Sequence, residues 1–583
     1  MKKLKLVTFI LMGIVLMTIP LLGACGEEAT ITATATATAT TTATATTTAT
    51  ATATVTPTTA AKPEGMFTFG IDSLGSEGFL PWITFQTDLL VFGEVYDTLA
   101  IETPEGKHLP SVAESWEWSD DYTTLTLNIR EGIQFQGGWG ELTSDDVAYT
   151  INKTMSENST SLAKSYMEII TSVTATDPNT VVIHQSAPNV DFADMYAFGS
   201  IAGAIVCKKY VEQVGEEEAN LNPVGSGPYR LVEHAHGNYV KYEAVEDHWR
   251  VVPEFKYLVV KAVPEESTRV AMLKTGDIDA TIIGPTSIKD IPEEDFTIDY
   301  WRYGPNTCII FGGMCRPANV DVYQEGYHNT DPWVDIRVRE AMNIAIDRDA
   351  INEALHYNTA QPMTIPFQIP GWTDLEPYPY NPDRARELLA EAAADGVFTP
   401  NAQGGFSFTL ISPSHPGVPM AQKETEAVAG YWSEIGIDAT ISPMDFGAYW
   451  LKVFELTNVG ECYSFRLTYA GANPYTYLMM CIVSDNLWGG RVQVPEMDEI
   501  SPLAEEALAE LDLEVRDGMY RNIAQKVYEN YIAVPLMQVP FIIVKNKSIV
   551  GDWPPNTGSY YYNFEYIRHA QPLNTFRLFD LVD

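Results

Sequence analysis

The sequence predicts an α/β protein of two lobes, built from mixed sheets flanked by helices. The chain has 583 residues, which is too long for one hydrophobic core, because single cores stop growing at roughly 250–300 residues. Stretches with strand-like alternation and stretches with helical spacing of apolar residues follow one another along most of the chain. Hydrophobic residues make up 45% of the sequence, an ordinary content for a folded protein, so we expect an ordered main body.

The amino-terminal residues are typical of an export signal. Three lysines within the first five residues precede an apolar run over 6–22, and small residues stand directly before Cys25. This pattern predicts that residues 1–24 are a signal peptide removed on export. Small residues before a cysteine resemble a bacterial lipobox, which implies a lipid attached to Cys25. An ordinary signal peptide followed by a coincidental cysteine is the alternative.

Residues 25–63 are predicted to form a flexible stalk. From 27 to 61 the sequence is almost entirely threonine and alanine, with hardly any large apolar side chain. Such a segment cannot bury enough surface to offset the entropy of its chain. The threonines are also candidates for O-glycosylation. We expect the stalk to let a membrane-tethered body move near the membrane.

The chain is strongly acidic, with a formal net charge of −41. Loss of residues 1–24, which hold three lysines and no acid, would bring the charge to −44. Lysine and arginine carry the binding of phosphate groups, so this balance argues against nucleic acid and anionic membrane surfaces as partners. It favours an exported protein with a well-solvated surface.

The sequence holds six cysteines, and Cys25 is assigned to the lipid. Export permits disulfides, so Cys308 can pair with Cys315, and Cys462 with Cys481. With Cys207 the number left is odd, so one thiol stays unpaired unless it joins two chains. No cysteine or histidine spacing resembles a zinc site, so we expect neither a metal nor a cofactor.

The elements before residue 220 are read from their periodicity. Residues 66–70 and 125–130 alternate as strands do, and 89–99 have helical spacing. A helix is expected over 142–150, with Thr143 or Ser144 as its N-cap and acidic residues in its first turn.

Residues 223–229 read Pro-Val-Gly-Ser-Gly-Pro-Tyr and predict a rigid corner that begins a sheet. Proline cannot donate an amide hydrogen and restricts the residue before it, while glycine permits backbone angles closed to other residues. Two alternating runs, 229–233 and 238–244, follow as a hairpin. A strand over 259–264 and an amphipathic helix over 266–279, closed by Gly276, come next.

The second half of the chain shows the same alternation of element types. Residues 300–313 read as one extended segment, and 533–540 as another. Helices are expected over 333–348, with Val338, Met342, Ala345 and Ile346 on one face, and over 380–392 and 420–436.

The motif at 223–229 resembles the signature of the family 5 solute-binding proteins of ABC importers, the dipeptide, oligopeptide and nickel type. Residues 109–150, 333–348 and 380–392 resemble three further blocks of the same family, and the likeness extends over 64–583. One departure is Gly137, which stands where the family usually has aspartate, in a loop lengthened by residues 139–141.

The resemblance implies a two-lobed periplasmic-binding-protein-like fold of type II, in the large cluster that has an extra subdomain. It implies a hinge of two crossing segments between the lobes. The expected divisions are a first lobe over 64–108, 221–305 and 541–583, an extra subdomain over 109–220, and a second lobe over 306–540.

The function implied is capture of a small organic solute, peptide or oligosaccharide, for delivery to the ABC permease subunits in the membrane. We expect a monomer that is not an enzyme and has no P-loop, held at the outer face of the cell membrane or in the periplasm. The sequence leaves open which membrane carries the anchor.

The resemblance also bears on the ligand. Peptide-binding relatives place an aspartate in a second-lobe segment, where it pairs with the peptide ammonium group. In this chain Ala470 and Leu467 occupy the positions of that aspartate and of a nearby tryptophan, which makes the usual mode of peptide binding less favourable. Side chains that could face the ligand are Trp82, Phe85, Tyr303, Trp372, Tyr469, Asn473 and Trp488, with Arg466 as an anchor for a carboxylate or phosphate. For each aromatic side chain the alternative is core packing, which is the more common role of buried aromatic residues.

Two other classes of function are compatible with the sequence. A secreted enzyme, such as a glycoside hydrolase, would need two of the many carboxylates. The sequence has neither a Gly-x-Ser-x-Gly elbow nor a His-Glu-x-x-His motif. A ligand sensor could use the same fold, since hinge closure can signal as well as deliver.

Overall fold

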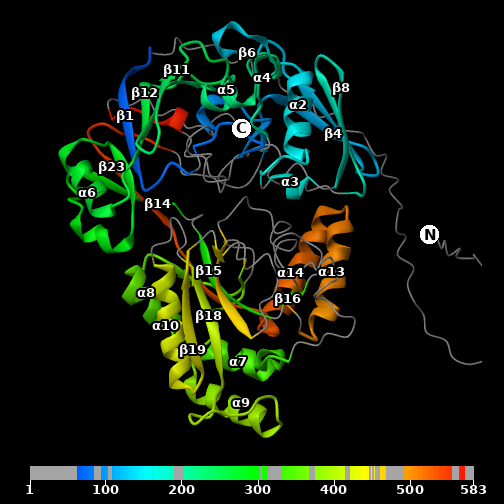
Figure 1. Ribbon diagram of the computed structural model, residues 1–583, viewed down its shortest axis with the longest axis vertical. Helices are drawn as coiled ribbons and strands as arrows, with labels where there is room; N and C mark the ends of the chain where they lie inside the picture. Colours follow the sequence, from blue (N-terminus) through cyan, green and yellow to red (C-terminus); the bar gives the residue numbers. More distant parts are fainter. Residues whose placement is uncertain are drawn as a thin grey trace, which may run out of the picture. The chain divides into compact units, whose positions relative to one another are not determined.

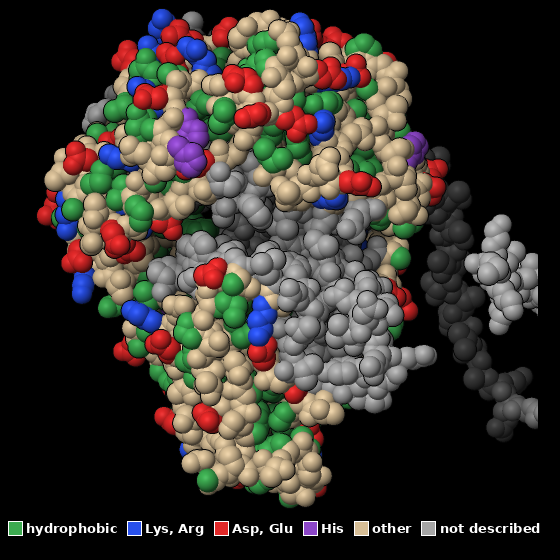
Figure 2. Space-filling model, in the orientation of Figure 1, with side chains coloured by type: hydrophobic (Ala, Val, Ile, Leu, Met, Phe, Trp, Pro, Cys, Tyr) green, Lys and Arg blue, Asp and Glu red, His purple; other side chains and the backbone are tan. Residues whose placement is uncertain are grey.

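The computed structural model describes residues 62–570, except 76, 84–92, 103–107, 162, 168, 189–202, 302–304, 313, 316–329, 367–373, 414–419, 446–447, 450–451, 453–459, 468–490, 493 and 554–563. The predicted signal peptide and lipid site, and the predicted stalk up to residue 61, therefore lie outside the described residues. Within the described part, no helix is both long enough and apolar enough to span a membrane. Figure 2 shows acidic side chains scattered over the visible face of the described residues, as a well-solvated surface requires.

The first large sheet has seven strands in the order β10-β11-β12-β1-β13-β23-β14 (Figure 1). Strand β1 pairs in parallel with β12 and β13, whereas β11 and β23 run in the opposite direction. The strands are β1 (Glu64–Ile71), β10 (Tyr229–Ala235), β11 (Tyr239–Ala244), β12 (Phe255–Ala262), β13 (Ala280–Ile283), β14 (Phe296–Trp301) and β23 (Phe541–Asn546). Helix α6 (Glu266–Thr275) packs against β13 and ends at Gly276, whose φ is 79°, as predicted.

The second large sheet has six strands in the order β17-β22-β15-β20-β18-β19. Its strands are β15 (Asn306–Phe311), β17 (Gln361–Pro362), β18 (Ser407–Pro413), β19 (Asp438–Met444), β20 (Glu461–Leu467) and β22 (Val534–Gln538). Helix α10 (Ala421–Glu434) lies along β18 and β19 (Figure 1). The other helices of this part are α7 (Ile336–Ile344), α8 (Arg348–His356), α9 (Pro382–Ala394), α13 (Met497–Ala509) and α14 (Leu513–Glu529).

A third, four-stranded sheet with the order β4-β5-β9-β8 lies between β3 and β10 in the sequence. Its strands are β4 (Ala113–Trp118), β5 (Thr124–Ile129), β8 (Ile170–Asp177) and β9 (Thr180–Gln185), and helix α2 (Ser144–Met155) packs on β8 and β9. Two two-stranded ladders precede α2: β2 (Ala100–Glu102) with β3 (His108–Pro110), and β6 (Gln134–Phe135) with β7 (Gly140–Glu141). Short helices α3 (Ala163–Tyr166), α4 (Lys208–Val214) and α5 (Glu216–Leu221) complete this region.

Helix starts show how local sequence sets these bounds. Thr143, one of two predicted caps, is the N-cap of α2, and its backbone N–H donates to Asp146 Oδ2 at 2.9 Å in a capping box. The helix predicted over 333–348 is wrong as one element, because α7 ends at Ile344 and α8 begins after Asp347. Asp347 accepts a hydrogen bond from Ala350 N–H at 2.9 Å, so it starts a new helix instead of continuing the first. Gly137, in the lengthened loop, has φ 71°, a conformation that favours glycine over aspartate.

The corner at 223–229 is a place of close backbone contact. A Cβ on Gly225 would lie 2.1 Å from the carbonyl oxygen of Val95, and one on Gly227 would lie 2.6 Å from that of Glu94. Gly227 N–H donates to Val95 O at 2.9 Å, so the corner is bonded to the short helix η2 (Gly93–Val95). Neither glycine has a positive φ, so lack of a side chain, and not unusual backbone angles, is what this corner requires.

Two of the cysteine expectations can be compared with the structure. Cys207 and Cys462 are buried free thiols, so the expected Cys462–Cys481 disulfide is absent from the described residues. Burial raises the pKa of Cys207 to about 11 and that of Cys462 well above its ordinary value, which leaves both thiols protonated and unreactive. The side chain of Cys315 and all of Cys481 lie outside the described residues.

The contact at the corner predicts a large loss of stability for Gly225→Ala. The added methyl group would meet backbone atoms that cannot move aside, so we expect the free energy of unfolding to fall by roughly 2–4 kcal/mol. Gly430→Ala is the matched control, because this glycine lies inside α10 with nothing within 4 Å of its Cβ. The control should gain about 0.5–1 kcal/mol from the better helix former. Urea unfolding of both variants checks this, and a wild-type midpoint for Gly225→Ala would refute the steric explanation.

Candidate functional site

The chain passes between the two large sheets at two short segments. One leads from Trp301 at the end of β14 to Asn306 at the start of β15, and the other from Gln538 to Phe541. The second spans three peptide steps, so its ends lie at most about 11 Å apart. Val539 N–H donates to the carbonyl oxygen of Pro305 at 3.0 Å, which joins the two crossing segments to each other. The two sheets are therefore held close together at this one place.

Strand directions decide which edges meet there. In the first sheet β1, β12, β13 and β14 run the same way, and β14 delivers the chain to the crossing at its carboxyl end. In the second sheet β18, β19, β20 and β22 share one direction, and β15 enters from the edge where they end. The crossing segments thus connect the carboxyl edges of both sheets. Ligands of open α/β sheets bind at such edges.

Three carboxamide side chains form a row on the carboxyl edge of the second sheet. Asn306 lies directly opposite Gln538 on the neighbouring strand, and Gln538 lies opposite Gln361 on the next. Directly opposed residues share a face of the sheet, with strands about 4.8 Å apart. We call Gln361, Gln538 and Asn306 the amide row.

The two inner members of the amide row are buried, and most of their amide atoms have no hydrogen-bond partner among the described residues. Asn306 is 0% exposed and Gln538 is 4% exposed, whereas Gln361 is exposed to solvent. Among the residues that the structure describes, Asn306 Oδ1, Asn306 Nδ2 and Gln538 Nε2 have no hydrogen-bond partner. Each buried polar atom without a hydrogen-bond partner lowers the stability of the folded protein by about 1–3 kcal/mol. Three such atoms in one row therefore call for an explanation.

Other polar groups near the same edge are buried too. The Ser412 Oγ, one residue before the end of β18, lacks a described partner. His356 at the end of α8 donates from Nε2 to Glu424 Oε1 on α10 at 2.5 Å, and both side chains are at most 1% exposed. These two groups pair with each other, and the amide row and Ser412 add uncharged hydrogen-bonding groups to the same edge.

The side chains nominated from the sequence fall mostly outside the described residues. This applies to Phe85, Tyr303, Trp372, Tyr469, Asn473 and Trp488, and also to Ala470. The backbone of Arg466 lies in β20, opposite Thr307 and one residue from the crossing edge, but its side chain is not described. The amide row was missed because Asn306 and Gln538 stand at the ends of otherwise apolar strands, a position that also suits a simple turn.

Trp82 is the one nominated aromatic side chain that the structure describes. It is 2% exposed, and its indole N–H donates to Glu216 Oε2 at 3.0 Å. Its ring meets that of Tyr149 edge-on at 5.9 Å, with the ammonium group of Lys153 6.0 Å from its centre. These contacts favour packing within the first part of the chain, and a role in ligand binding stays a prediction.

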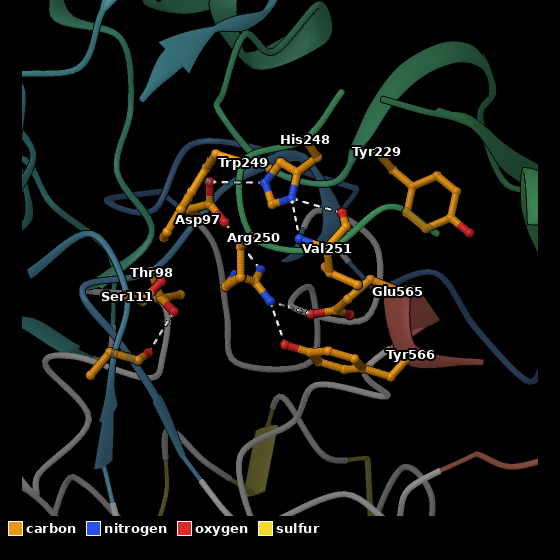
Figure 3. A network of polar contacts seen from close by, with 12 residues as sticks. Asp97, Thr98, Ser111, Tyr229, His248, Trp249, Arg250, Val251, Glu565 and Tyr566 are labelled. Atoms are coloured by element: carbon orange, nitrogen blue, oxygen red, sulfur yellow. Dashed lines mark hydrogen bonds and ion pairs between the residues drawn. The ribbon is translucent and has the colours of Figure 1, made fainter. Parts of the chain in front are cut away.

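A second polar cluster is centred on Asp97 (Figure 3). It differs from the amide row because its polar and charged groups are bonded to one another. Asp97 Oδ2 accepts from Trp249 Nε1 at 2.7 Å and from His248 Nε2 at 3.2 Å, and its Oδ1 accepts from Arg250 Nη2 at 3.1 Å. Arg250 also reaches Glu565 at 3.5 Å and bonds the hydroxyl of Tyr566. These contacts therefore connect the chain near residue 565 to the segment around Asp97 and to the segment around Arg250.

The electrostatics of this cluster follow from its partners. Burial alone would raise the pKa of Asp97, but His248, Arg250 and Trp249 stabilise the carboxylate and bring its pKa down to about 2. Burial and the nearby Glu565 raise the pKa of Glu94 well above its ordinary value. The paired contacts of Asp97 indicate a structural role for the cluster.

The low pKa of Asp97 predicts a loss of stability in acid. An unfolded aspartate has a pKa of about 3.9, so the stabilisation from this carboxylate is complete above that pH and disappears as pH falls toward 2. Asp97→Asn should cost roughly 3–5 kcal/mol at pH 6, because it removes the nearer carboxylate of the buried Arg250 and leaves Glu565 at 3.5 Å. It should also flatten the dependence of the free energy of unfolding on pH between about pH 4 and 2. Urea unfolding at several pH values measures both effects. The exposed Asp120→Asn is the control, and an equal loss there would contradict this account.

Metal binding finds no support in the described residues, where no three His, Cys, Asp or Glu side chains are grouped to hold an ion.

Comparison with known proteins gives consistent results. Glutathione-binding protein GsiB of Shigella flexneri is 27% identical over 461 residues, which are 77% of this chain and 84% of that protein. Heme-binding protein A of Haemophilus influenzae is 24% identical over 452 residues, covering 72% of this chain and 77% of that one.

Solved structures agree on the fold. The periplasmic binding protein DppA from Helicobacter pylori, in complex with the peptide STSA, superposes with a TM-score of 0.70 at 21% identity and covers 88% of this chain and 99% of that one. NikA from Brucella suis, in complex with Fe(III)-EDTA, gives a TM-score of 0.73 at 18% identity and covers 87% of this chain and 100% of that one. These neighbours are two-lobed binding proteins, as the sequence predicts.

The family profile described as "Bacterial extracellular solute-binding proteins, family 5 Middle" matches residues 107–481, well over half of the chain. With the crossing segments and the two carboxyl edges described, this match establishes that the chain belongs to family 5 of the bacterial extracellular solute-binding proteins.

Proposed function

We propose that this protein captures an organic solute between the carboxyl edges of its two large sheets and delivers it to an ABC permease. The observation that carries the proposal is the pair of crossing segments, which leads both sheets to one place and allows the lobes to turn about it. The lobe boundaries expected from the sequence are part of this proposal, as are the nominated ligand contacts.

Binding of this kind works through a shift in population. A solute that contacts both lobes binds the closed arrangement more tightly than the open one, and it therefore moves the equilibrium toward closure. The gain cannot exceed the difference in affinity between the two arrangements. Enclosure in a dry site with a few polar anchors then supplies the affinity.

The relatives differ in what their names say they bind, from glutathione and heme to a short peptide. The family alone therefore does not decide the solute of this chain. The uncharged amide row supports a peptide-like or oligosaccharide solute over a metal complex. Ala470, in place of a charged anchor, makes the usual mode of peptide binding less favourable.

The proposal includes the location of the protein. Cleavage after residue 24 and a lipid on Cys25 would hold it on the outer face of a membrane, with residues 25–63 as a tether. A monomer tethered in this way meets its permease by diffusion in the plane of the membrane.

A thermal-shift screen tests the function directly. A solute that binds only the folded protein raises its Tm, and the rise grows with the logarithm of the solute concentration over Kd. At a concentration of a hundred times Kd, the free energy of unfolding increases by about 2.7 kcal/mol. We expect a rise with short peptides or oligosaccharides and no comparable rise with nickel chelates. Turnover of the solute during incubation would instead support the secreted-enzyme alternative.

Cys25→Ser tests the anchor. Serine cannot accept the thioether-linked lipid, so we expect the variant to leave the membrane fraction and appear in the soluble extracytoplasmic fraction. Ser73→Ala, a change outside the lipobox-like stretch, is the control and should stay with the membrane. Unchanged membrane association of Cys25→Ser would show that Cys25 does not carry the anchor.

A further inference from the structure

We infer that the amide row, Gln361, Gln538 and Asn306, binds uncharged hydrogen-bonding groups of the solute, either amide groups or hydroxyl groups. The inference rests on the proposed function and names the chemistry of the ligand at that same site. It starts from Asn306 and Gln538, which are at least nine-tenths buried and present amide atoms with no partner among the described residues.

The fold satisfies a comparable amide elsewhere in the same lobe. Asn343 is fully buried on α7, and its Nδ2 donates to Arg339 O and to Ala533 O, each at 3.1 Å. Its Oδ1 accepts from Arg348 Nη2 at 3.1 Å. Burying an asparagine in this lobe therefore does not require leaving it unpartnered. At Asn306, where the chain crosses between the sheets, both amide atoms lack a described partner, whereas Asn352 on α8 lacks one only at Oδ1.

Backbone geometry fixes the register of the amide row. Leu536 is an extra residue in the pairing of β22 with β15, because Thr307 pairs with Met537 and Cys308 pairs with Pro535. Thr307 Oγ1 contacts both N and O of Met537 at 3.2 Å, next to this bulge. Bulges re-aim side chains and are frequent beside binding sites. Here the bulge sets Asn306 opposite Gln538.

The chemistry of the row indicates what it takes. A carboxamide presents one acceptor and two donor hydrogens without net charge, so its best complement is a group that both donates and accepts. Peptide amides and sugar hydroxyls both donate and accept hydrogen bonds. A carboxylate only accepts, so it would pair with the NH2 group alone, and an ammonium ion only donates, so it would pair with the carbonyl oxygen alone. Two ionisable side chains near this edge, His356 and Glu424, pair with each other.

The extent of the row sets a minimum size for the ligand. Three side chains on neighbouring strands span about 10 Å, at about 4.8 Å between strands. An extended segment of three residues has the same length, at about 3.3 Å for each residue. A ligand that uses the whole row is therefore an oligomer or an extended molecule.

The test replaces the buried amides by apolar side chains of similar size, Asn306→Leu and Gln538→Met, in the full chain. If the amides serve a ligand, the ligand-free variants should unfold at the same temperature as wild type or higher, since an unpartnered buried group has been removed. Their affinity for a blocked tetra-alanine peptide or for maltotetraose should fall at least tenfold. Asn343→Leu, the matched control, should lower Tm and leave the affinity of the folded protein unchanged.

The outcomes separate this inference from the proposed function. Blocked tetra-alanine and maltotetraose distinguish the two sources of uncharged groups, because only the source that is used will raise the Tm of wild type. A rise with unblocked tetra-alanine or nickel-histidine alone would overturn the inference and leave the proposed function standing. Unchanged affinity in Asn306→Leu, or a fall in its ligand-free Tm like that of Asn343→Leu, would also overturn the inference. No rise with any of these probes counts against the proposed function itself.

Discussion

The hydrogen bond from Val539 N–H to Pro305 O stands at the point on which the whole arrangement depends, because it joins the two segments that cross between the large sheets. One of those segments contains only two residues between β22 and β23. Such short connections hold the carboxyl edges of both sheets at one place and leave each sheet to complete its own core. A solute bound there could contact both sheets, so the chain path alone, before any side chain is considered, is the basis for proposing the site at this place.

The two polar clusters of the described structure differ in whether their buried polar groups are paired. Around Asp97, carboxylate, guanidinium, indole and imidazole groups pair with one another, and the cluster fastens distant parts of the chain. At the amide row the inner side chains are buried with amide atoms that have no partner among the described residues, which costs stability. Proteins keep such unfavourable features chiefly where function requires them. The contrast is the physical reason for proposing that the ligand binds at the crossing and not at Asp97.

Much of the fold could be predicted from the sequence because it depends on patterns among residues that lie close together in the chain. The hairpin after Pro228, the capping of α2 and the closure of α6 at Gly276 each depend on neighbouring residues. The break between α7 and α8 was missed because the apolar spacing continues across it, while one aspartate begins a new helix. The role of Gly225 was misjudged, since close contact with Val95 joins residues far apart in the chain. The pairing of Asn306 with Gln538 is of the same kind, as it requires strand register that no local pattern contains.

The most direct test of the central claim is the radius of gyration in solution, measured by small-angle X-ray scattering on the unlipidated chain with and without a solute that raises Tm. If the solute lies between the carboxyl edges and draws the lobes together, the radius of gyration falls on binding and returns to its initial value when the solute is removed. A radius of gyration unchanged at saturating solute would contradict the account, because the solute would then be bound without closing the two lobes.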